Sequence, residues 1–440
     1  MPINKMELAS TADSAMSPER ALHAGRAVGT NYNRVTVSMD LSRNSRMIRD
    51  AFVSGLLSVG SNVLDAGYVP APVAALAAEQ SDCCAMIGEP NIYGVMSSIS
   101  LRNPDGSIFN DPQMRELEKY SISTPLPGYE SINAIKGCDM VIDNYLKKFV
   151  DVCGDIDCPV IMDCGCGSTS LVAPQALAAV GADVMSLNSH PDRTHSPRFP
   201  GIEPSEAKDV QSSVGSMHGS IGILLNGDGT RVALIDETAR YVTGSQMLAL
   251  LVKFIEPEKL VVPIDMSFGV DLAFWGDSIQ NDKREIIRCE PNPISLANTM
   301  KEQKADFGAL SNGTVILPGM TKCPDGMFTA AMLAKYAGTN SLSRTLDAMP
   351  TYFTDEIKIH CTGSMEALGR KITNVIDEVD YKGYVHSKGW RVDMENGWFL
   401  LNYPDQDGMM KINIESDDKA YAVGLLEMAK DIVNSSLRSQ

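Results

Sequence analysis

A short loop between two apolar runs carries oxygen-bearing side chains at positions that could hold a cation. The segment 221–237 has the sequence IGILLNGDGTRVALIDE. Asn226, Asp228 and Thr230 lie two residues apart, so an extended backbone would place all three side chains on one side, and the glycines between them permit a sharp path. Mg²⁺ prefers oxygen ligands and usually carboxylates, and only Asp228 is a carboxylate. The loop therefore predicts either a weak magnesium site or a plain turn between two strands.

The length, charge and cysteine usage of the chain narrow the classes of partner. At 440 residues the chain exceeds what one hydrophobic core usually supports, so several domains are expected. The formal net charge of −17 disfavours nucleic acid and anionic membrane surfaces, and no apolar stretch approaches the ~20 residues of a membrane-spanning helix. The first residues lack the apolar run of a secretory signal, and the ten cysteines form no CxxC pair. We therefore expect a cytoplasmic protein with reduced thiols and no zinc site.

Helix and strand patterns alternate in three α/β units followed by an α+β unit. Ser17 is expected to cap a first helix that has Pro18 at its first position and ends at Gly29. A Gly-rich turn in the sequence DCGCGST could bind phosphate, but tight packing against the sheet is the favoured interpretation. Turn-rich or polar stretches near 125–140, 238–258 and 345–357 predict domain boundaries. Further helices are predicted at 46–59, 172–180, 327–336, 365–379 and 419–433, and strands at 35–39, 62–66, 182–187, 259–264, 357–360, 398–401 and 410–414 and near residues 286, 307 and 390.

Several segments are similar to the α-D-phosphohexomutases, the family of phosphomannomutase, phosphoglucomutase and phosphoglucosamine mutase. The similar segments are PERALHAGRAVG, AFVSGLLSVGSNVLDAGYVPAPV, NPDGS and DCGCGSTSLVAPQALAAVGADVMSLN, and they occur in the family's order. The cation loop resembles the family's metal loop, DGDGDR or DGDADR. Gly227, Asp228, Gly229 and Arg231 match that motif, and the other two candidate ligands do not.

The resemblance implies a heart-shaped molecule of four domains around a central cleft, each domain contributing one loop. We expect an α/β domain I at 1–135 with a phosphoserine loop at 86–94, an α/β domain II at 136–245 with a metal loop at 224–231, an α/β domain III at 246–354 with a sugar loop at 307–314, and a smaller α+β domain IV at 355–440 with a phosphate loop at 400–408.

The resemblance also implies a nucleophile, because the family transfers a phosphoryl group through a phosphoserine. In this chain the loop has the sequence MIGEPNIYG, and alignment from NPDG places the family serine at or near Pro90 and its His neighbour near Asn91. No Ser or Thr occurs between residues 82 and 96. The sequence predicts that the phosphoryl carrier is missing, with Ser97 and Ser98, in a strand-like run, as the alternative hydroxyls.

The two substrate loops have changed as well. In FGALSNGTVILPG the family's two acids are replaced, while Asn312 keeps the turn. In LLNYPDQDGMMKINIES, Asn402 replaces the phosphate-binding Arg, and Asp405 and Asp407 would repel a phosphate dianion. Arg231 could bind an anion, but we expect it to stabilise the loop by pairing with an acid of its own domain, such as Asp236 or Asp163. These substitutions leave Arg231, Asn312 and Asn402 as candidate substrate contacts.

Three hypotheses about function follow from these substitutions. The first is a phosphohexomutase-fold protein without mutase activity, acting as a partner subunit, a regulator or a ligand-binding protein, with a paralogous mutase as one possible partner. The second is an active hexose-phosphate mutase, an intramolecular phosphotransferase with relocated residues. The third is another chemistry in the cleft, on a cationic or polyhydroxyl ligand bound by residues such as Glu89, Tyr93 and the acids near 405. The first is favoured from sequence, with no cofactor unless the altered loop still binds Mg²⁺.

Overall fold

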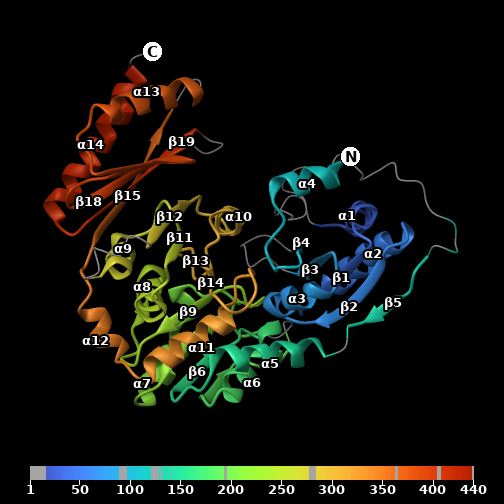
Figure 1. Ribbon diagram of the computed structural model, residues 1–440. Coiled ribbons are helices and arrows are strands. Elements are labelled where there is room, and N and C mark those ends of the chain that lie inside the picture. Colours follow the sequence, from blue (N-terminus) through green and yellow to red (C-terminus); the bar gives the residue numbers. More distant parts are fainter. Residues whose placement is uncertain are drawn as a thin grey trace.

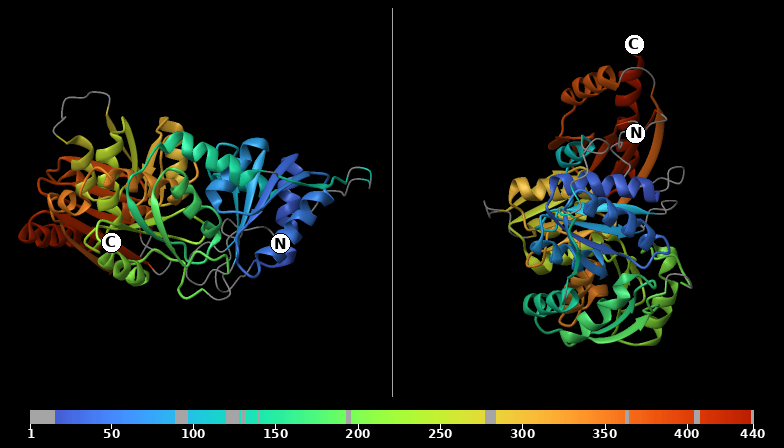
Figure 2. Two further views of the ribbon diagram at one scale, coloured as in Figure 1. Left: turned by 90° about the horizontal axis from the view of Figure 1, so that it is seen from below. Right: turned by 90° about the vertical axis from the view of Figure 1, so that its right-hand side faces the viewer.

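In the part of the chain that the structure describes, four β-sheets, one for each predicted unit, organise the fold (Figure 1). The computed structural model describes residues 16–88, 97–119, 128, 130, 132–138, 140–192, 196–276, 284–361, 365–403 and 408–438. The first and C-terminal units lie at opposite ends of the molecule, with the second and third units between them (Figure 2). The predicted fold class, three α/β units followed by an α+β unit, is confirmed.

The first sheet has the strand order β4-β3-β1-β2-β5, and β4 runs antiparallel to β3 at one edge. The predicted cap of α1 is confirmed, because the Ser17 side chain accepts a hydrogen bond from the Arg20 N–H. The helix continues past Gly29, since Thr30 and Asn31 donate side-chain hydrogen bonds back to carbonyls four residues earlier. The elements of this unit are α1 (Pro18–Asn31), β1 (Arg34–Met39), α2 (Ser45–Ser58), β2 (Asn62–Tyr68), α3 (Ala71–Ala77), η1 (Ala78–Gln80), β3 (Cys83–Gly88), β4 (Ser98–Arg102), α4 (Asp111–Glu118) and β5 (Ile135–Gly137).

The second sheet has the order β10-β9-β8-β6-β7 and places the cation loop between its antiparallel strands β8 and β9. Both strands are fully buried, as the apolar runs on either side of the loop predict. The elements are α5 (Val141–Cys153), β6 (Pro159–Asp163), η3 (Ser168–Leu171), α6 (Ala173–Ala179), β7 (Asp183–Leu187), η5 (Pro204–Glu206), α7 (Lys208–Ser216), β8 (Ile221–Leu225), β9 (Val232–Ile235) and β10 (Tyr241–Val242).

The third sheet, β12-β11-β13-β14, is preceded by a helix that the sequence analysis did not predict. The stretch 238–258 was expected to be turn-rich, and this expectation is wrong over most of its length. Thr243 and Gln246 form a capping box, and the apolar run that follows is buried as α8. The elements are α8 (Gly244–Ile255), β11 (Lys259–Pro263), α9 (Phe268–Trp275), β12 (Glu285–Cys289), α10 (Pro293–Gln303), β13 (Phe307–Ala309), β14 (Val315–Ile316), α11 (Gly326–Ala337) and α12 (Leu342–Asp347).

The C-terminal sheet, β15-β19-β18-β17-β16, is antiparallel throughout, and α13 and α14 pack against it (Figure 1). Its edge strand β16 was not predicted. The elements are β15 (Phe353–His360), α13 (Met365–Asp377), β16 (Gly383–His386), β17 (Gly389–Asp393), β18 (Gly397–Asn402), β19 (Met409–Ser416) and α14 (Lys419–Arg438).

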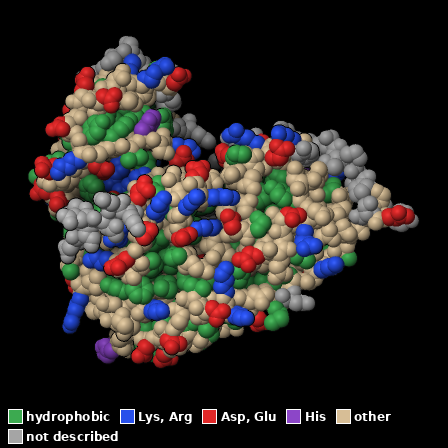
Figure 3. All heavy atoms as spheres, viewed as in Figure 1, with side chains coloured by type: hydrophobic (Ala, Val, Ile, Leu, Met, Phe, Trp, Pro, Cys, Tyr) green, Lys and Arg blue, Asp and Glu red, His purple; other side chains and the backbone are tan. Residues whose placement is uncertain are grey.

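The hydrophobic cores show which units are tightly joined. One buried cluster runs from α3 and β3 of the first unit through the second unit to α11 and α12, whereas the C-terminal unit has its own core. A small cluster of Ile264, Trp398 and Leu400 connects that core to the third unit. On the face shown in Figure 3, an indentation separates the C-terminal lobe from the N-terminal lobe. Within the described ranges, no helix combines the length and apolar character needed to cross a membrane.

Candidate functional site

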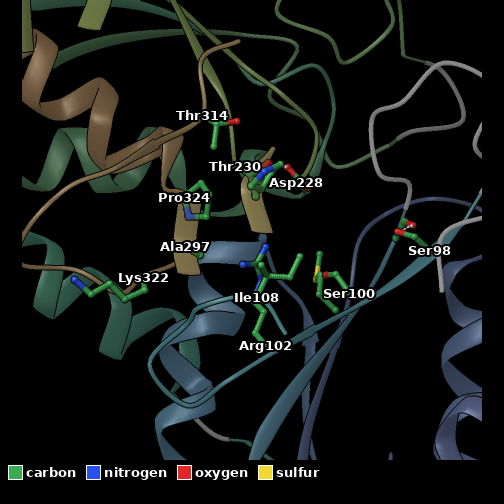
Figure 4. A pocket seen from close by; sticks show the side chains of 13 residues that line it. Ser98, Ser100, Arg102, Ile108, Asp228, Thr230, Ala297, Thr314, Lys322 and Pro324 are labelled. Carbon is green, nitrogen blue, oxygen red and sulfur yellow. Dashed lines mark hydrogen bonds between the residues drawn. The ribbon is translucent and has the colours of Figure 1, made fainter. Parts of the chain in front are cut away.

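A cavity of about 260 Å³ lies where the first three units meet (Figure 4). The ribbon of β3 and β4 contributes one wall, the loop between β8 and β9 contributes Asp228 and Thr230, and the third unit contributes α10 and the segment 314–324. Three segments far apart in the sequence therefore form one concave surface. Such a junction is where ligands commonly bind.

Strand β4 presents three polar side chains to this cavity. Ser98, Ser100 and Arg102 are alternate residues of the strand, so they lie on the same face of the sheet, and all three line the cavity. Both serines are half-buried, and the Ser98 hydroxyl donates to the Gly88 carbonyl at 3.1 Å. Ser97, the other hydroxyl considered from sequence, is buried and accepts a hydrogen bond from the Asn44 side chain at 2.5 Å, away from the cavity lining.

Arg102 is a buried cation to which the described part of the chain offers no acidic partner. Its exposed fraction is 6%, and its Nη1 donates to the Gly106 carbonyl at 3.2 Å, while its Nε has no acceptor among the described residues. Among the described residues, no carboxylate lies within ion-pair distance of Arg102. Burial raises the pKa of the neighbouring Cys84 and Cys323 thiols to about 12, so both stay neutral. The positive charge of Arg102 is therefore not balanced by these neighbours.

Lys322 also lines the cavity, but its charge is directed elsewhere. Its Nζ donates to the Asp306 carboxylate at 2.9 Å and to the Ala305 carbonyl at 3.1 Å. In Figure 4 its side chain extends away from Arg102 and Asp228. The Lys322 stem forms part of the wall, and Arg102 supplies the positive charge at the cavity.

The candidate metal ligands bond to one another. The Asp228 Oδ1 accepts from the Asn226 Nδ2 at 2.7 Å, from the Thr230 hydroxyl at 2.7 Å and from the Thr230 N–H at 3.0 Å. The Asn226 Oδ1 accepts from the Arg231 N–H at 2.9 Å, which fixes the orientation of the amide. The amide NH₂ of Asn226 therefore faces the Asp228 carboxylate. A cation bound between these two side chains would require the amide oxygen to face it instead.

This donor set does not fit Mg²⁺. The ion requires oxygen ligands, usually including more than one carboxylate, and here one carboxylate faces an amide nitrogen and a hydroxyl that donates to it. In the part of the chain that the structure describes, no group of three or more His, Cys, Asp or Glu side chains could hold a metal ion.

The loop itself is fixed by hydrogen bonds to both neighbouring units. The Asp228 carbonyl accepts from the Ala71 N–H of the first unit at 2.8 Å, and the Gly229 carbonyl accepts from the Gly326 N–H of the third unit at 2.8 Å. Gly313 approaches the loop from the sugar-loop side, and its carbonyl accepts from the Val232 N–H at 3.1 Å. These contacts hold the Asp228 side chain at the cavity.

The Gly-rich turn after β6 packs directly under the loop. Ser168 donates to the Gly227 carbonyl through its N–H at 3.0 Å and its hydroxyl at 2.9 Å. A Cβ added at Gly167 would lie 2.5 Å from the Gly227 Cα, so a side chain does not fit there. These contacts support the interpretation of the turn as a packing element.

Arg231 does not pair with either acid named from the sequence. Asp163 and Asp236 each bind another arginine of the second unit, at 2.7 and 2.8 Å. The Arg231 Nη1 instead lies 4.0 Å from the Glu203 carboxylate, so the predicted partners are wrong although the acid does belong to the same unit. Glu203 was missed because it lies 28 residues earlier, and no local pattern connects it to the loop.

The remaining candidate residues are dispersed. Asn312 accepts from the Thr314 N–H at 3.2 Å and shares with Arg231 a second cavity of about 170 Å³. Asn402, in the C-terminal unit, donates to the Asn413 side chain at 3.0 Å and lies at neither cavity. Pro90, Asn91, Glu89, Tyr93, Asp405 and Asp407 lie outside the described residues.

Arg102 and Ser100 were not recognised from the sequence. The alternation of polar and apolar residues in SISLR is the signal that could have placed them on one face of a strand. It did not indicate which face a cavity would meet, because that depends on the second and third units.

Comparisons with known proteins define the class. The family model for "Phosphoglucomutase/phosphomannomutase, alpha/beta/alpha domain I" matches residues 8–118. The model for domain II of the same family matches residues 143–241. A phosphoglucomutase/phosphomannomutase family protein from Burkholderia thailandensis superposes with a TM-score of 0.81 at 18% identity, covering 96% of this chain and 94% of that one. Parafusin from Paramecium, a phosphoglucomutase, gives 0.71 at 10% identity, covering 97% and 93%. These structural likenesses show the fold.

The chain belongs to the α-D-phosphohexomutase family. It is 29% identical over 437 residues to the "Probable phosphoglucosamine mutase" of Methanocella arvoryzae, covering 97% of this chain and 96% of that protein. A protein of the same name from Methanosarcina acetivorans is 29% identical over 436 residues, covering 96% of each chain.

These relatives overturn the hypothesis favoured from sequence. A protein without mutase activity was inferred from the altered loops, yet relatives along almost the full length are named as mutases. Each altered motif was taken as a separate requirement for activity. In the structure, a cation and hydroxyls line the cavity from positions outside those motifs.

Proposed function

We propose that this protein is an active sugar-phosphate mutase, an intramolecular phosphotransferase whose substrate class is hexosamine phosphates such as glucosamine phosphate. The observation that carries the proposal is the cavity at the junction of three units, which combines a buried cation, two serine hydroxyls and a carboxylate. Support for the substrate class comes from the relatives named phosphoglucosamine mutase, which this chain resembles along almost its whole length.

Phosphoryl transfer within a sugar phosphate requires an oxygen that receives the group and a positive charge that stabilises it. Among the described residues at the cavity, Ser98 and Ser100 are the hydroxyls on the face of Arg102. Thr230 is less suited, because its hydroxyl already donates to Asp228. We propose that one of these two serines carries the phosphoryl group between the two hydroxyl positions of the sugar.

Proton transfer completes the proposed step. When a serine Oγ–P bond forms, the P–O bond to the sugar breaks, and the serine proton must finally reach the sugar oxygen. Asp228 lies at the same cavity and is positioned by three hydrogen bonds, so its carboxylate is the proposed relay. In the second step the other sugar hydroxyl attacks the phosphoserine, so that a new P–O bond to the sugar forms as the serine Oγ–P bond breaks. The proton of that hydroxyl returns to the serine oxygen.

We further propose that no resident metal takes part and that the protein is cytoplasmic. The first proposal is supported by the hydrogen bonds among Asn226, Asp228 and Thr230, which direct an amide nitrogen at the carboxylate. The second is supported by the ten cysteines, all of which are free thiols.

Conversion of glucosamine 6-phosphate to glucosamine 1-phosphate, followed by ³¹P NMR with a catalytic amount of a hexosamine 1,6-bisphosphate, tests the activity. We expect turnover, with lower rates on glucose and mannose phosphates. The Methanocella arvoryzae relative serves as a matched control under the same conditions. No conversion of any of the three sugar phosphates, at a concentration at which a relative with measurable mutase activity converts glucosamine phosphate, would overturn the proposal.

The carrier serine is identified by intact-mass and peptide mass spectrometry after incubation with the bisphosphate. We expect one added phosphoryl group, lost in either Ser98→Ala or Ser100→Ala. A phosphoryl group that persists in the double variant would refute both serines as carriers.

A further inference from the structure

Strand β15 leaves one edge of the C-terminal sheet open (Figure 1). Within the described ranges β15 lies at the end of the strand order and pairs with β19 alone. It is eight residues long and is exposed or half-buried throughout. A long edge strand presents N–H and C=O groups that can pair with a strand of another chain. We infer that this edge binds the same edge of a second copy of this chain, which joins two C-terminal sheets into one.

The hydrogen bonds of β15 define which backbone groups face the open edge. The Cys361 N–H, one residue beyond the strand, donates to the Gly408 carbonyl at 2.8 Å on the side of β19. The Glu356 N–H instead donates to the Asp355 side chain at 2.8 Å. Successive residues of an antiparallel strand point their backbone groups to opposite sides. The odd-numbered residues of the strand therefore bond to β19, and the even-numbered residues point their N–H and C=O groups to the open edge.

The charges on β15 select one register for a symmetric pair. A twofold axis pairs the two strands antiparallel, and even-numbered residues must then lie opposite each other to exchange hydrogen bonds. A register centred on Ile357 places Glu356 opposite Lys358 of the second copy, twice in each dimer. The two neighbouring registers would instead place Glu356 opposite itself or Lys358 opposite itself. Opposite charges across strands are stabilising and like charges are destabilising, so the register centred on Ile357 is favoured.

Lys358 lacks an acidic partner within the described structure. Its cross-strand neighbour is Lys411, a like charge, and Lys411 pairs with Glu356 at 2.6 Å. None of the ion pairs among the described residues includes Lys358. Charged side chains on an edge usually prevent pairing with another chain. Here they are self-complementary, because Glu356 of the second copy supplies the acid that Lys358 lacks.

The other face of β15 brings apolar side chains to the twofold axis. Ile357 and Ile359 are half-buried and pack against the core of the C-terminal unit. In the favoured register Ile357 lies opposite its own copy, and Phe353, which is 41% exposed, lies opposite Cys361 of the second copy. Pairing therefore extends the apolar layer of one sheet into the next. Two strands of this length form a small interface, so we expect a weak, reversible dimer.

Sedimentation velocity of the full chain, at roughly 1 to 200 µM protein, tests the inference in the range where small interfaces associate. We expect a concentration-dependent dimer. Lys358→Glu should weaken its association about 10-fold or more, because two Glu–Glu contacts replace two ion pairs. Reversing both charges, Glu356→Lys together with Lys358→Glu, restores opposite pairs and should return the affinity to within about 3-fold of wild type.

Lys382→Glu is the matched control for charge. It makes the same change just before β16, at the other edge of the same sheet, and should leave the dimer affinity within about 3-fold of wild type. Circular dichroism establishes that each variant is folded.

Ile357→Cys tests the register directly. At the centre of the favoured register the two Cα atoms would lie about 4.5 Å apart, within reach of a disulfide. Ile359→Cys is the control on the same face, because its two copies would lie more than about 13 Å apart. Mild oxidation should convert Ile357→Cys into a covalent dimer on a non-reducing gel, and should convert neither Ile359→Cys nor the wild type, whose ten free cysteines are buried or half-buried.

A chain that stays monomeric over this concentration range would overturn the inference. So would a dimer that Lys358→Glu and Lys382→Glu weaken equally, a folded charge-reversed variant that does not recover association, or equal crosslinking of Ile357→Cys and Ile359→Cys. These measurements need no turnover, so the dimer and the mutase activity can each fail alone.

Discussion

Asp325 should give the protein a pH-dependent stability that a single isosteric change removes. Its buried carboxylate caps α11 by accepting from the Phe328 N–H at 2.9 Å, and it accepts from the Tyr145 hydroxyl at 2.7 Å. Burial raises the pKa of Asp325 from 3.8 to about 6, even though these hydrogen bonds act in the opposite direction. The carboxyl group is therefore protonated at mildly acidic pH in the folded chain and ionised in the unfolded chain.

The sign of the effect follows from that difference. Below pH 3.8 both states are protonated, and the stabilising contribution is fully present. As the pH rises toward 6, the unfolded chain releases its proton while the folded chain keeps it, so the free energy of unfolding falls. A shift of about two pKa units corresponds to a loss of about 3 kcal/mol, which is complete once the pH exceeds the folded-state pKa.

Asp325→Asn keeps the shape and can still cap the helix, but it cannot titrate. The free energy of unfolding of the wild type minus that of the variant should therefore fall by about 3 kcal/mol between about pH 4 and pH 6.5 and then level off. Urea denaturation at half-unit pH intervals measures this difference. Tyr145→Phe is the control: it removes a donor to the carboxylate, so its pH dependence should be at least as steep as that of the wild type. Parallel stability curves for wild type and Asp325→Asn would refute the assigned pKa shift.

Three further predictions concern the loop and the domain contacts. Asn226→Asp combined with Thr230→Asp should create a carboxylate cluster, so Mg²⁺ at about 100 times its Kd should stabilise the double variant by roughly 3 kcal/mol in thermal-shift assays; an equal response in the wild type would contradict the metal-free loop. Gly313→Ala should cost about 2 kcal/mol or more, because its φ is +83° and a Cβ would lie 2.3 Å from the Val232 carbonyl oxygen; an unchanged melting temperature would refute this. Arg391→Met should cost about 3–5 kcal/mol in urea denaturation, since this buried guanidinium joins β17 to two carbonyls that follow β11; a cost below about 1 kcal/mol would show that the contact between the two units does not depend on it.

The sequence predicted elements whose signals are local. The start of the first helix was predicted correctly, because Ser17 and Pro18 act on the first turn. Its predicted end at Gly29 lies two residues before the observed end. Helix α8 was missed, because the polar residues on either side of it indicated a turn, although Thr243 begins a capping box. Strand β16 was missed because four residues at a sheet edge carry little pattern, and its partner strand supplies the pairing.

The site was harder to predict because its chemistry depends on distant neighbours. The importance of Arg102 arises from the absence of an acidic partner in the described structure, which no sequence window records. Arg231 does pair with an acid of its own unit, but the two acids named as examples were wrong for a related reason. Asp163 and Asp236 are nearby acids, but each is occupied by an arginine that the fold brings to it. Sequence identifies the charged residues, and the fold determines which of them neutralise each other.

The altered cation loop and the buried arginine are consistent with one electrostatic arrangement. In the metal loop of the family pattern, three carboxylates and one divalent cation would together leave one net negative charge. Asn226, Asp228 and Thr230 carry one negative charge without any ion, and the Asn226 amide donates to the carboxylate in place of a cation. The two substitutions therefore leave the loop with the same net charge, and the metal-free loop proposed above is compatible with that charge. The positive charge that a transferring phosphoryl group requires would then come from Arg102 on β4, across the same cavity.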